Sequence, residues 1–388
     1  MKIKKNLLDT FLVVLVMLVT ILPLFIAKQL VILSLSFLLV RIITSRDIFF
    51  YSKKKIIIFI LLMPGILGAF FSAPEHLVRF FGILLIVLGF PFSSFKIKHS
   101  FIIVISSLIL LYLIITQILG LQGNQIILSL RDIAYNYEGA EVHRSYRVTD
   151  NIFKNAFDFS YWGVRGGGLY SNPNTLSGVV IIYFFIFDVS WKYFNQSINH
   201  DKKKWNKYFY WSIFLLVLFC LMQTKSKTYL IAFFAYLIFQ HLDVIDLLRL
   251  KIKKKLMVSL FFGVGILSLF FGKVIDGIFL EGGSAFVKYS ILFNYLENAS
   301  VFNLIFGGIF FNFDAEFSLW IGAVGLIGVI AFFNFYRMVY QYSPQSKALL
   351  ISLLLISLGG SLFYSLLLVS ILIPLFVILL SSSKRPNE

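Results

Sequence analysis

The chain has 388 residues, of which 59% are hydrophobic and only 14% are charged, and its mean hydropathy is +0.89. This composition excludes a soluble domain and predicts an all-α, polytopic membrane protein. The net charge of +17 would suit nucleic acid, but lysine and arginine lie in short clusters between apolar runs, where they orient membrane helices, so we expect no nucleic-acid partner. The single cysteine, Cys220, excludes an intrachain disulfide.

Apolar runs close to bilayer length predict about twelve transmembrane helices within one integral membrane domain, residues 1–388. The first run imitates a signal peptide, but no clear small-residue cleavage site follows it, so we interpret it as a retained first helix. The runs lie at 9–27, 29–44, 56–73, 77–95, 100–120, 174–190, 208–223, 228–243, 256–272, 316–336, 347–360 and 364–381.

The basic clusters predict the orientation of these helices. With the N-terminus inside, the inner segments hold 24 of the 35 lysines and arginines, and each inner segment carries at least two. We therefore expect both termini to be cytoplasmic. Two long polar segments, 121–173 and 273–315, then fall on the outer side, where function usually concentrates.

The first outer loop ends in R-G-G-G-L-Y-S-N-P-N-T-L-S-G, residues 165–178. Asn172 is a natural N-cap for the next helix, with Pro173 as its first residue. Three glycines let the backbone approach a ligand, and a helix N-terminus favours an anion. With Arg165 beside it, the stretch predicts a phosphate or pyrophosphate cradle, although an ordinary capped turn also explains it. Aromatic residues earlier in the loop suit sugar rings or an interfacial belt equally well.

Further candidates follow in the later outer segments. Lys225 and Lys227, in the outer turn Q-T-K-S-K-T, break the positive-inside trend, which favours anion binding over contact with lipid headgroups. In the second long loop Lys288 is another outer cation. Asp314 stands at an N-cap position and Glu316 in a first helical turn; capping explains both, and the functional interpretation is a general base near the cations.

Several common constellations are absent from the sequence. There is no acidic pair suited to a metal and a nucleotide in an outer loop, no P-loop and no H-E-x-x-H, and the five histidines are scattered. We therefore expect neither a metal nor another cofactor. Charged residues at mid-membrane are few, which argues against an ion-coupled transporter.

The order of the motifs resembles a known family. An arginine, glycines and N-P-N open a helix after a long outer loop, the turn T-K-S-K follows, and a second outer loop ends in D-x-E-F-x-x-W-I-G-x-x-G-L-I-G. Over about 120–335 this layout resembles the bacterial O-antigen and capsule polymerases (Wzy) and their relatives, the O-antigen ligases (WaaL).

That resemblance implies a GT-C-like, metal-independent membrane glycosyltransferase of the bacterial cytoplasmic (inner) membrane. It would transfer a glycan from undecaprenyl pyrophosphate to the sugar end of another lipid-linked repeat unit, building capsule or the O-antigen of lipopolysaccharide. The lipid-linked glycan and the bilayer are then its partners, and a Wzz-like chain-length regulator is a candidate partner.

The resemblance also assigns residues by position. Arg165 matches the essential arginine of the first outer loop, Lys225 and Lys227 stand where relatives commonly have S-R, and Lys288 stands where an arginine is usual. Lysine keeps the charge but gives up the bidentate fork. The predicted catalytic residues are Arg165, Asp314 and Glu316, and the predicted pyrophosphate- and glycan-binding residues are Arg147, Asn172, Asn174, Lys225, Lys227 and Lys288.

Two alternatives stay open. The ligases typically place a histidine near the end of the second loop; residues 303–320 contain none, which favours a polymerase over a ligase-type transferase. A lipid-linked oligosaccharide flippase is the alternative from another class, but it predicts internal repeats, central charges and short outer loops, which the sequence does not clearly show.

Overall fold

The computed structural model describes most of the chain and is helical throughout the part described. No strand occurs within these ranges, so the all-α prediction is confirmed for them. The described residues are 2–22, 24–49, 52–72, 77–138, 149, 151–157, 164–170, 172–196, 203–241, 294–308, 316–343, 346–359 and 366–381.

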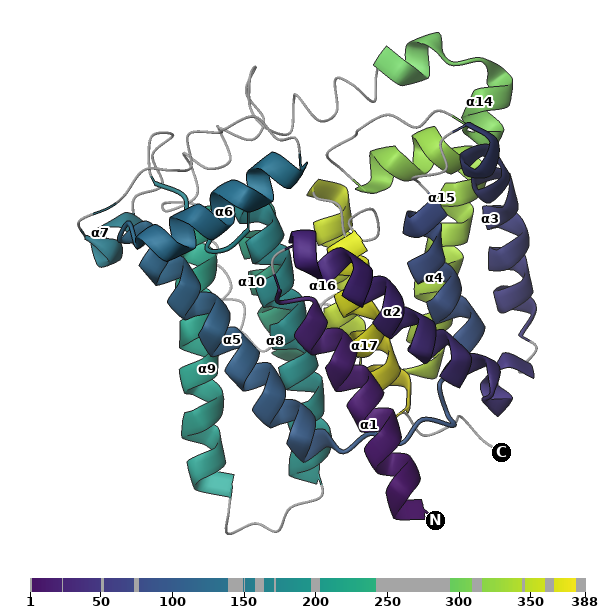
Figure 1. Ribbon diagram of the computed structural model, residues 1–388. Coiled ribbons are helices and arrows are strands. Elements are labelled where there is room, and N and C mark those ends of the chain that lie inside the picture. The colour runs from purple at the N-terminus through teal and green to yellow at the C-terminus, as the bar shows by residue number, and fades with distance from the viewer. Residues whose placement is uncertain are drawn as a thin grey trace, which may run out of the picture.

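The helices follow the predicted apolar runs closely (Figure 1). Eleven of the twelve runs overlap a helix, although the run at 9–27 extends past the end of α1 into α2, and the run at 256–272 lies outside the described residues. The first half of the chain forms α1 (Lys2–Val19), α2 (Leu24–Ile43), the short 3₁₀ helix η1 (Arg46–Phe49), α3 (Lys53–Ser72), α4 (Leu77–Gly89), α5 (His99–Leu121), α6 (Gln125–Glu138) and α7 (Ile152–Phe157). The second half forms α8 (Pro173–Gln196), α9 (Lys203–Thr224), α10 (Lys227–His241), α14 (Val301–Phe306), α15 (Glu316–Tyr342), α16 (Lys347–Gly359) and α17 (Leu366–Ser381).

Five of these helices are long and apolar enough to cross a bilayer. They are α3, α5, α8, α9 and α15, and the remaining apolar helices are shorter. The chain is therefore a helical, membrane-embedded protein. The full number of twelve spans and the GT-C-like arrangement stay predictions.

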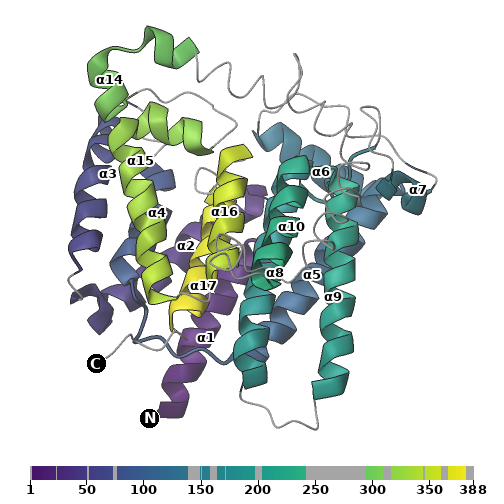
Figure 2. The ribbon, with the colours of Figure 1, turned by 180° about the vertical axis from the view of Figure 1, so that it is seen from behind.

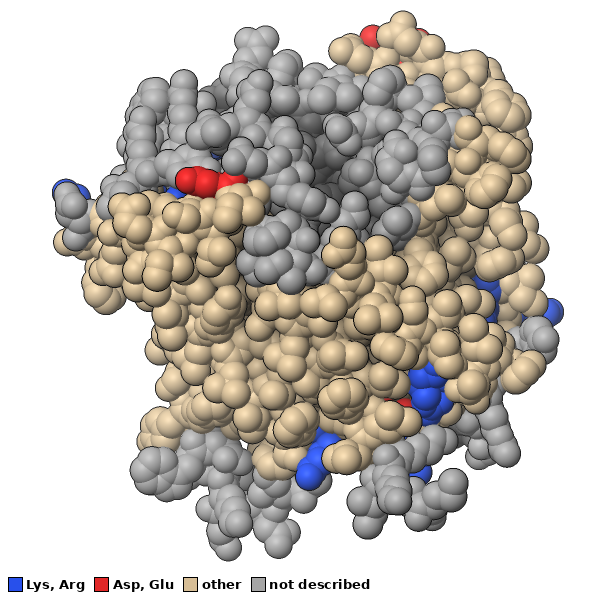
Figure 3. All heavy atoms as spheres, viewed as in Figure 1, with Lys and Arg blue, Asp and Glu red and all other residues tan. Residues whose placement is uncertain are grey.

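The helices that were expected to begin at the inner side begin at one common end. α1, α5 and α9 all start at the lower end in Figure 1, whereas α6, α7 and α14 lie at the opposite end, and Figure 2 shows the same arrangement from behind. On the face drawn in Figure 3, lysine and arginine side chains gather toward the same lower half. The predicted outer segments thus share one end of the molecule, while the side of the membrane on which that end lies stays a prediction.

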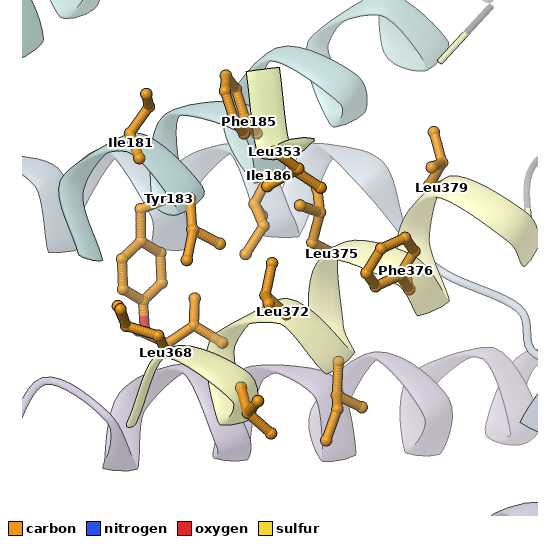
Figure 4. Close-up of a cluster of buried hydrophobic side chains, with 14 of the residues drawn as sticks. Ile181, Tyr183, Phe185, Ile186, Leu353, Leu368, Leu372, Leu375, Phe376 and Leu379 are labelled. Carbon is orange, nitrogen blue, oxygen red and sulfur yellow. The ribbon is translucent and has the colours of Figure 1, made fainter. Parts of the chain in front are cut away.

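Helix α8 forms the centre of the core. Its side chains from Leu176 to Ser190 are buried on every face, as expected for a helix that is apolar all round and surrounded by other helices. Helix α17 packs along it and also meets α1 and α4. Figure 4 shows Tyr183 and Ile186 of α8 facing Leu368 and Leu372 of α17.

A buried carboxylate joins α8 to its two successors near their inner ends. The Asp188 side chain is only 1% exposed. It accepts hydrogen bonds from the hydroxyl groups of Tyr210 on α9, at 2.7 Å, and Tyr236 on α10, and it pairs with Lys192 at 2.6 Å. A buried charge is tolerated when it is paired and hydrogen-bonded in this way. Asp188 therefore fixes the three helices against one another.

Helix α15 is not the continuous helix that the apolar run 316–336 suggests. The backbone of Gly325 has φ 70° and ψ −164°, which interrupts the helix. The chain changes direction there, so that the first part of α15 lies across the end of the molecule while the second part runs along it (Figure 1). Glycine permits this conformation because it has no Cβ.

Candidate functional site

The predicted N-cap of α8 is confirmed. The Asn172 side-chain oxygen accepts a hydrogen bond from the backbone N–H of Asn174 at 2.8 Å, and α8 begins at Pro173. The Asn172 carbonyl accepts the first intrahelical bonds, from the N–H groups of Thr175 and Leu176. The first turn of α8 is thus capped, and its positive end lies beside the loop that carries Arg165.

Arg165 joins this first turn to the end of α9. Its Nη2 donates to Oδ1 of Asn174 at 2.8 Å, and its Nε donates to the carbonyl oxygen of Thr224 at 3.1 Å. A second contact ties the same two helices, because the hydroxyl groups of Ser177 and Thr224 are 2.6 Å apart. Asn174, predicted to bind the pyrophosphate or the glycan, therefore orients the guanidinium.

Lys227 lies within electrostatic reach of Arg165. It is half-buried at the first position of α10 and precedes the apolar run at 228–243. Burial lowers the pKa of its ammonium group, and the positive charge of Arg165 lowers that pKa further. Two like charges held together and partly removed from water disfavour one another, and a bound anion would offset that cost.

Lys225 contacts the first outer loop. Its backbone adopts φ 54°, an uncommon left-handed conformation for a residue with a side chain. Its Nζ donates to Oδ1 of the buried Asn155 at 3.1 Å. The turn between α9 and α10 is thus anchored to α7, in which Asn155 lies.

A buried network of amide side chains, which the sequence analysis did not predict, holds the backbone on both sides of Arg165. Gln117 on α5 donates from Nε2 to the carbonyls of Gly166 and Cys220, each at 3.1 Å. The N–H of Gly166 in turn donates to the carbonyl of Gln223 at 3.0 Å. Asn155 donates to Oε1 of Gln223 at 2.7 Å and to a loop carbonyl. The sequence feature that could have predicted this network is the presence of isolated glutamines within or at the end of apolar runs.

The glycine run has a packing reason. Gly166, Gly167 and Gly168 are all buried. A Cβ on Gly166 would lie 3.0 Å from side-chain carbons of α5, and one on Gly167 would lie 2.7 Å from the carbonyl oxygen of Tyr170. Gly168 also has φ 59°. Close packing of the loop against α5 and against itself, together with this backbone conformation, accounts for these glycines without a ligand.

The structure brings together five of the predicted residues, namely Arg165, Asn172, Asn174, Lys225 and Lys227, at the ends of α8, α9 and α10 that the sequence predicts to be outer. Arg147, Lys288 and Asp314 fall outside the described ranges. Glu316 begins α15 as expected, but its side chain is not among those described. The roles assigned to all of these residues stay predictions.

The donor set of the described site is cationic and amide-rich. Within the described ranges no three histidine, cysteine, aspartate or glutamate side chains gather into a possible metal site. The arrangement suits a polyanion held by charge, by hydrogen bonds and by a helix N-terminus. Comparison of the chain with protein-family models, with curated proteins and with solved structures found no match.

Proposed function

We propose that this protein is a metal-independent membrane glycosyltransferase that polymerises undecaprenyl-pyrophosphate-linked repeat units into O-antigen or capsular polysaccharide. The resemblance of its motifs to the Wzy polymerases supports the proposal, and it would act at the outer face of the bacterial cytoplasmic membrane. The carrying observation is that Arg165 is hydrogen-bonded to the capped first turn of α8 and to the end of α9, with Lys227 within its electrostatic reach.

The proposed role of this cluster is to bind the donor pyrophosphate. As the sugar C1–O bond breaks, negative charge develops on the departing pyrophosphate. Cations and a helix end that are already in place stabilise that charge without reorganising. Two hydrogen bonds, from Nη2 and Nε, fix the orientation of the Arg165 guanidinium before any phosphate binds.

The acceptor half of the reaction is assigned to the start of α15. An acceptor sugar hydroxyl attacks the anomeric carbon of the donor; its oxygen forms the new bond to C1, and the pyrophosphate leaves with the electrons of the old one. The hydroxyl proton passes to a carboxylate, for which Asp314 and Glu316 are the candidates. Such a group need only orient the hydroxyl and accept the proton.

An extension assay tests the proposal. The purified protein in nanodiscs is given its undecaprenyl-pyrophosphate repeat unit with EDTA present, and the products are separated on a gel. We expect a ladder with a spacing of one repeat. Arg165→Ala should lower the rate by about 10²–10³-fold, the usual effect of removing a donor aimed at developing charge.

Lys154→Ala is the matched control, because Lys154 is an exposed cation on α7 in the same outer loop. It should extend chains at the wild-type rate. A thermal melt of each variant establishes that it is folded. Full extension by folded Arg165→Ala would remove the central residue from the proposal. No ladder from the wild-type protein would overturn polymerisation, and transfer to lipid A core instead would identify a ligase.

A further inference from the structure

Helix α14 exposes an apolar surface at the end of the molecule that carries the proposed site. None of its side chains is buried. Val301 is 72% exposed and Phe302 is 67% exposed, and Ile305 and Phe306 are each more than a third exposed. Residues 299–308 contain no charged side chain. An uncovered surface of this kind has a partner in most proteins.

Several backbone groups at the two ends of α14 form hydrogen bonds within the protein. The Ser300 hydroxyl accepts a hydrogen bond from the N–H of Asn303 at 3.2 Å, and the N–H of Gly307 donates to the Asn303 carbonyl at 2.8 Å. The N–H of Gly308 donates to the carbonyl of Ala323 at 3.1 Å. The break at Gly325 interrupts the hydrogen-bond ladder of α15 beside that carbonyl, so the turn that follows α14 supplies a donor there. A short helix can lie in an apolar medium only if its ends are satisfied in this way.

Backbone packing places the C-terminal end of α14 close to the outer end of α3. A Cβ on Gly307 would lie 2.4 Å from backbone atoms of Ala323 and Val324, and a Cβ on Gly65 of α3 would lie 2.7 Å from the Val324 side chain. Gly65 precedes the last residue of α3, Ser72, by seven positions, or about 10 Å of helix. The C-terminal end of α14 thus lies close to the outer end of α3, while the rest of α14 is drawn above that end in Figures 1 and 2.

The face of α3 that points away from α15 carries an apolar stripe. Ile60, Leu67, Phe70 and Phe71 are exposed, and the last two reach 61% and 79%. The stripe follows helical spacing along one of the five helices long enough to span a bilayer, so it faces lipid. Helix α14 lies just beyond the outer end of this helix (Figures 1 and 2).

We propose that the exposed apolar face of α14, defined by Val301, Phe302, Ile305 and Phe306, is inserted into the lipid bilayer at the interface next to the outer end of α3. The partner is the bilayer itself. The chain therefore enters the membrane surface before α15 begins. Through the contact between Gly307 and Gly325, α14 fixes the depth of the part of α15 that follows the break. This inference is independent of the proposed enzymatic activity.

Spin labels on single cysteines test the insertion. In a Cys220→Ala background, Phe302→Cys is labelled and reconstituted in nanodiscs, and its collision rates with oxygen and with a water-soluble nickel chelate are measured. Asn298→Cys, an exposed polar position one turn earlier, is the matched control, and Phe70→Cys is the lipid reference. We expect oxygen collisions to exceed nickel collisions at 302 and 70, and the reverse at 298.

Each other result overturns the proposal in a definite way. If nickel collisions dominate at 302 as at 298, α14 lies in water. If both collision rates at 302 are low and the spectrum shows dipolar broadening, the apolar face is covered by a second copy of the chain. Val301→Cys repeats the measurement at the most exposed position of α14, so a folding defect in Phe302→Cys leaves the test intact.

Discussion

The contact between α14 and the break in α15 depends on two glycines, and their replacement has effects that can be worked out separately. In Gly325→Ala the new Cβ would lie 2.3 Å from the carbonyl oxygen of Ile305 and 2.6 Å from the N–H nitrogen of Gly307. In Gly307→Ala it would lie 2.4 Å from backbone atoms of α15. Both residues also have φ near 70°, so each substitution carries a conformational cost and a steric cost.

Gly308 separates the two costs. It has φ 99°, yet a Cβ there would meet no atom within 4 Å. Placing alanine in a left-handed conformation costs roughly 1–2 kcal/mol, and overpacking against atoms that cannot move adds about 1–3 kcal/mol. We expect Gly308→Ala to lose about 1–2 kcal/mol of stability, and Gly325→Ala and Gly307→Ala to lose about 2–5 kcal/mol each.

Unfolding of the detergent-solubilised variants by heat, or by SDS titrated into mild detergent, provides the measurement, with loss of helical circular dichroism as the signal. The order of the three variants matters more than any single value, because they share one host and one reference state. Equal losses for Gly325→Ala and Gly308→Ala would refute the close backbone contact, because only the conformational cost would then be seen.

Three further predictions concern the site. Asn174→Ala should lower the extension rate about tenfold, because Arg165 loses the hydrogen bond that orients it, and should cost no more than about 1.5–3 kcal/mol of stability, because the Asn172 cap survives; initial rates and a thermal melt check this. Gln117→Leu should destabilise the fold by about 1–3 kcal/mol in the same melts, because two buried carbonyls lose their donor. Because the pKa of Lys227 is lowered in the folded protein, its positive charge destabilises the fold at neutral pH, and this cost is removed as pH rises through the folded-state pKa. A bound anion would raise that pKa again, so inorganic pyrophosphate should bind with proton uptake and more weakly at high pH. Binding that calorimetry shows to be independent of pH would contradict this prediction.

The helical framework could be predicted from the sequence because bilayer-length apolar runs permit few other structures. The cap at Asn172 could be predicted as well, since proline and asparagine constrain the local backbone on their own. The hydrogen-bond partners of Arg165 could not be predicted. Its contacts with Thr224 and Asn174 depend on how α8 and α9 are aligned, and a uniformly apolar sequence does not specify that alignment.

The break at Gly325 shows the same limit. Gly322, Gly325 and Gly328 recur every third residue within one apolar run, and each is compatible with a helix. Only the approach of the α14 backbone distinguishes Gly325, because it supplies the N–H that donates to the Ala323 carbonyl. Contacts between segments distant in the chain are therefore what decides where this helix is interrupted.

Polar contacts have a particular role in such a molecule, because one apolar helix can slide along another without exposing anything that lipid would not cover. Buried hydrogen bonds then determine the axial position of each helix. Helix α8 has them near both ends: Asn174 and Ser177 bind Arg165 and Thr224 at the outer end, and Asp188 binds Tyr210 and Tyr236 about 20 Å away. The inner contact therefore helps to hold the Thr224 carbonyl where Arg165 needs it, so that the position of the proposed phosphate-binding arginine depends in part on a carboxylate at the opposite end of the helix.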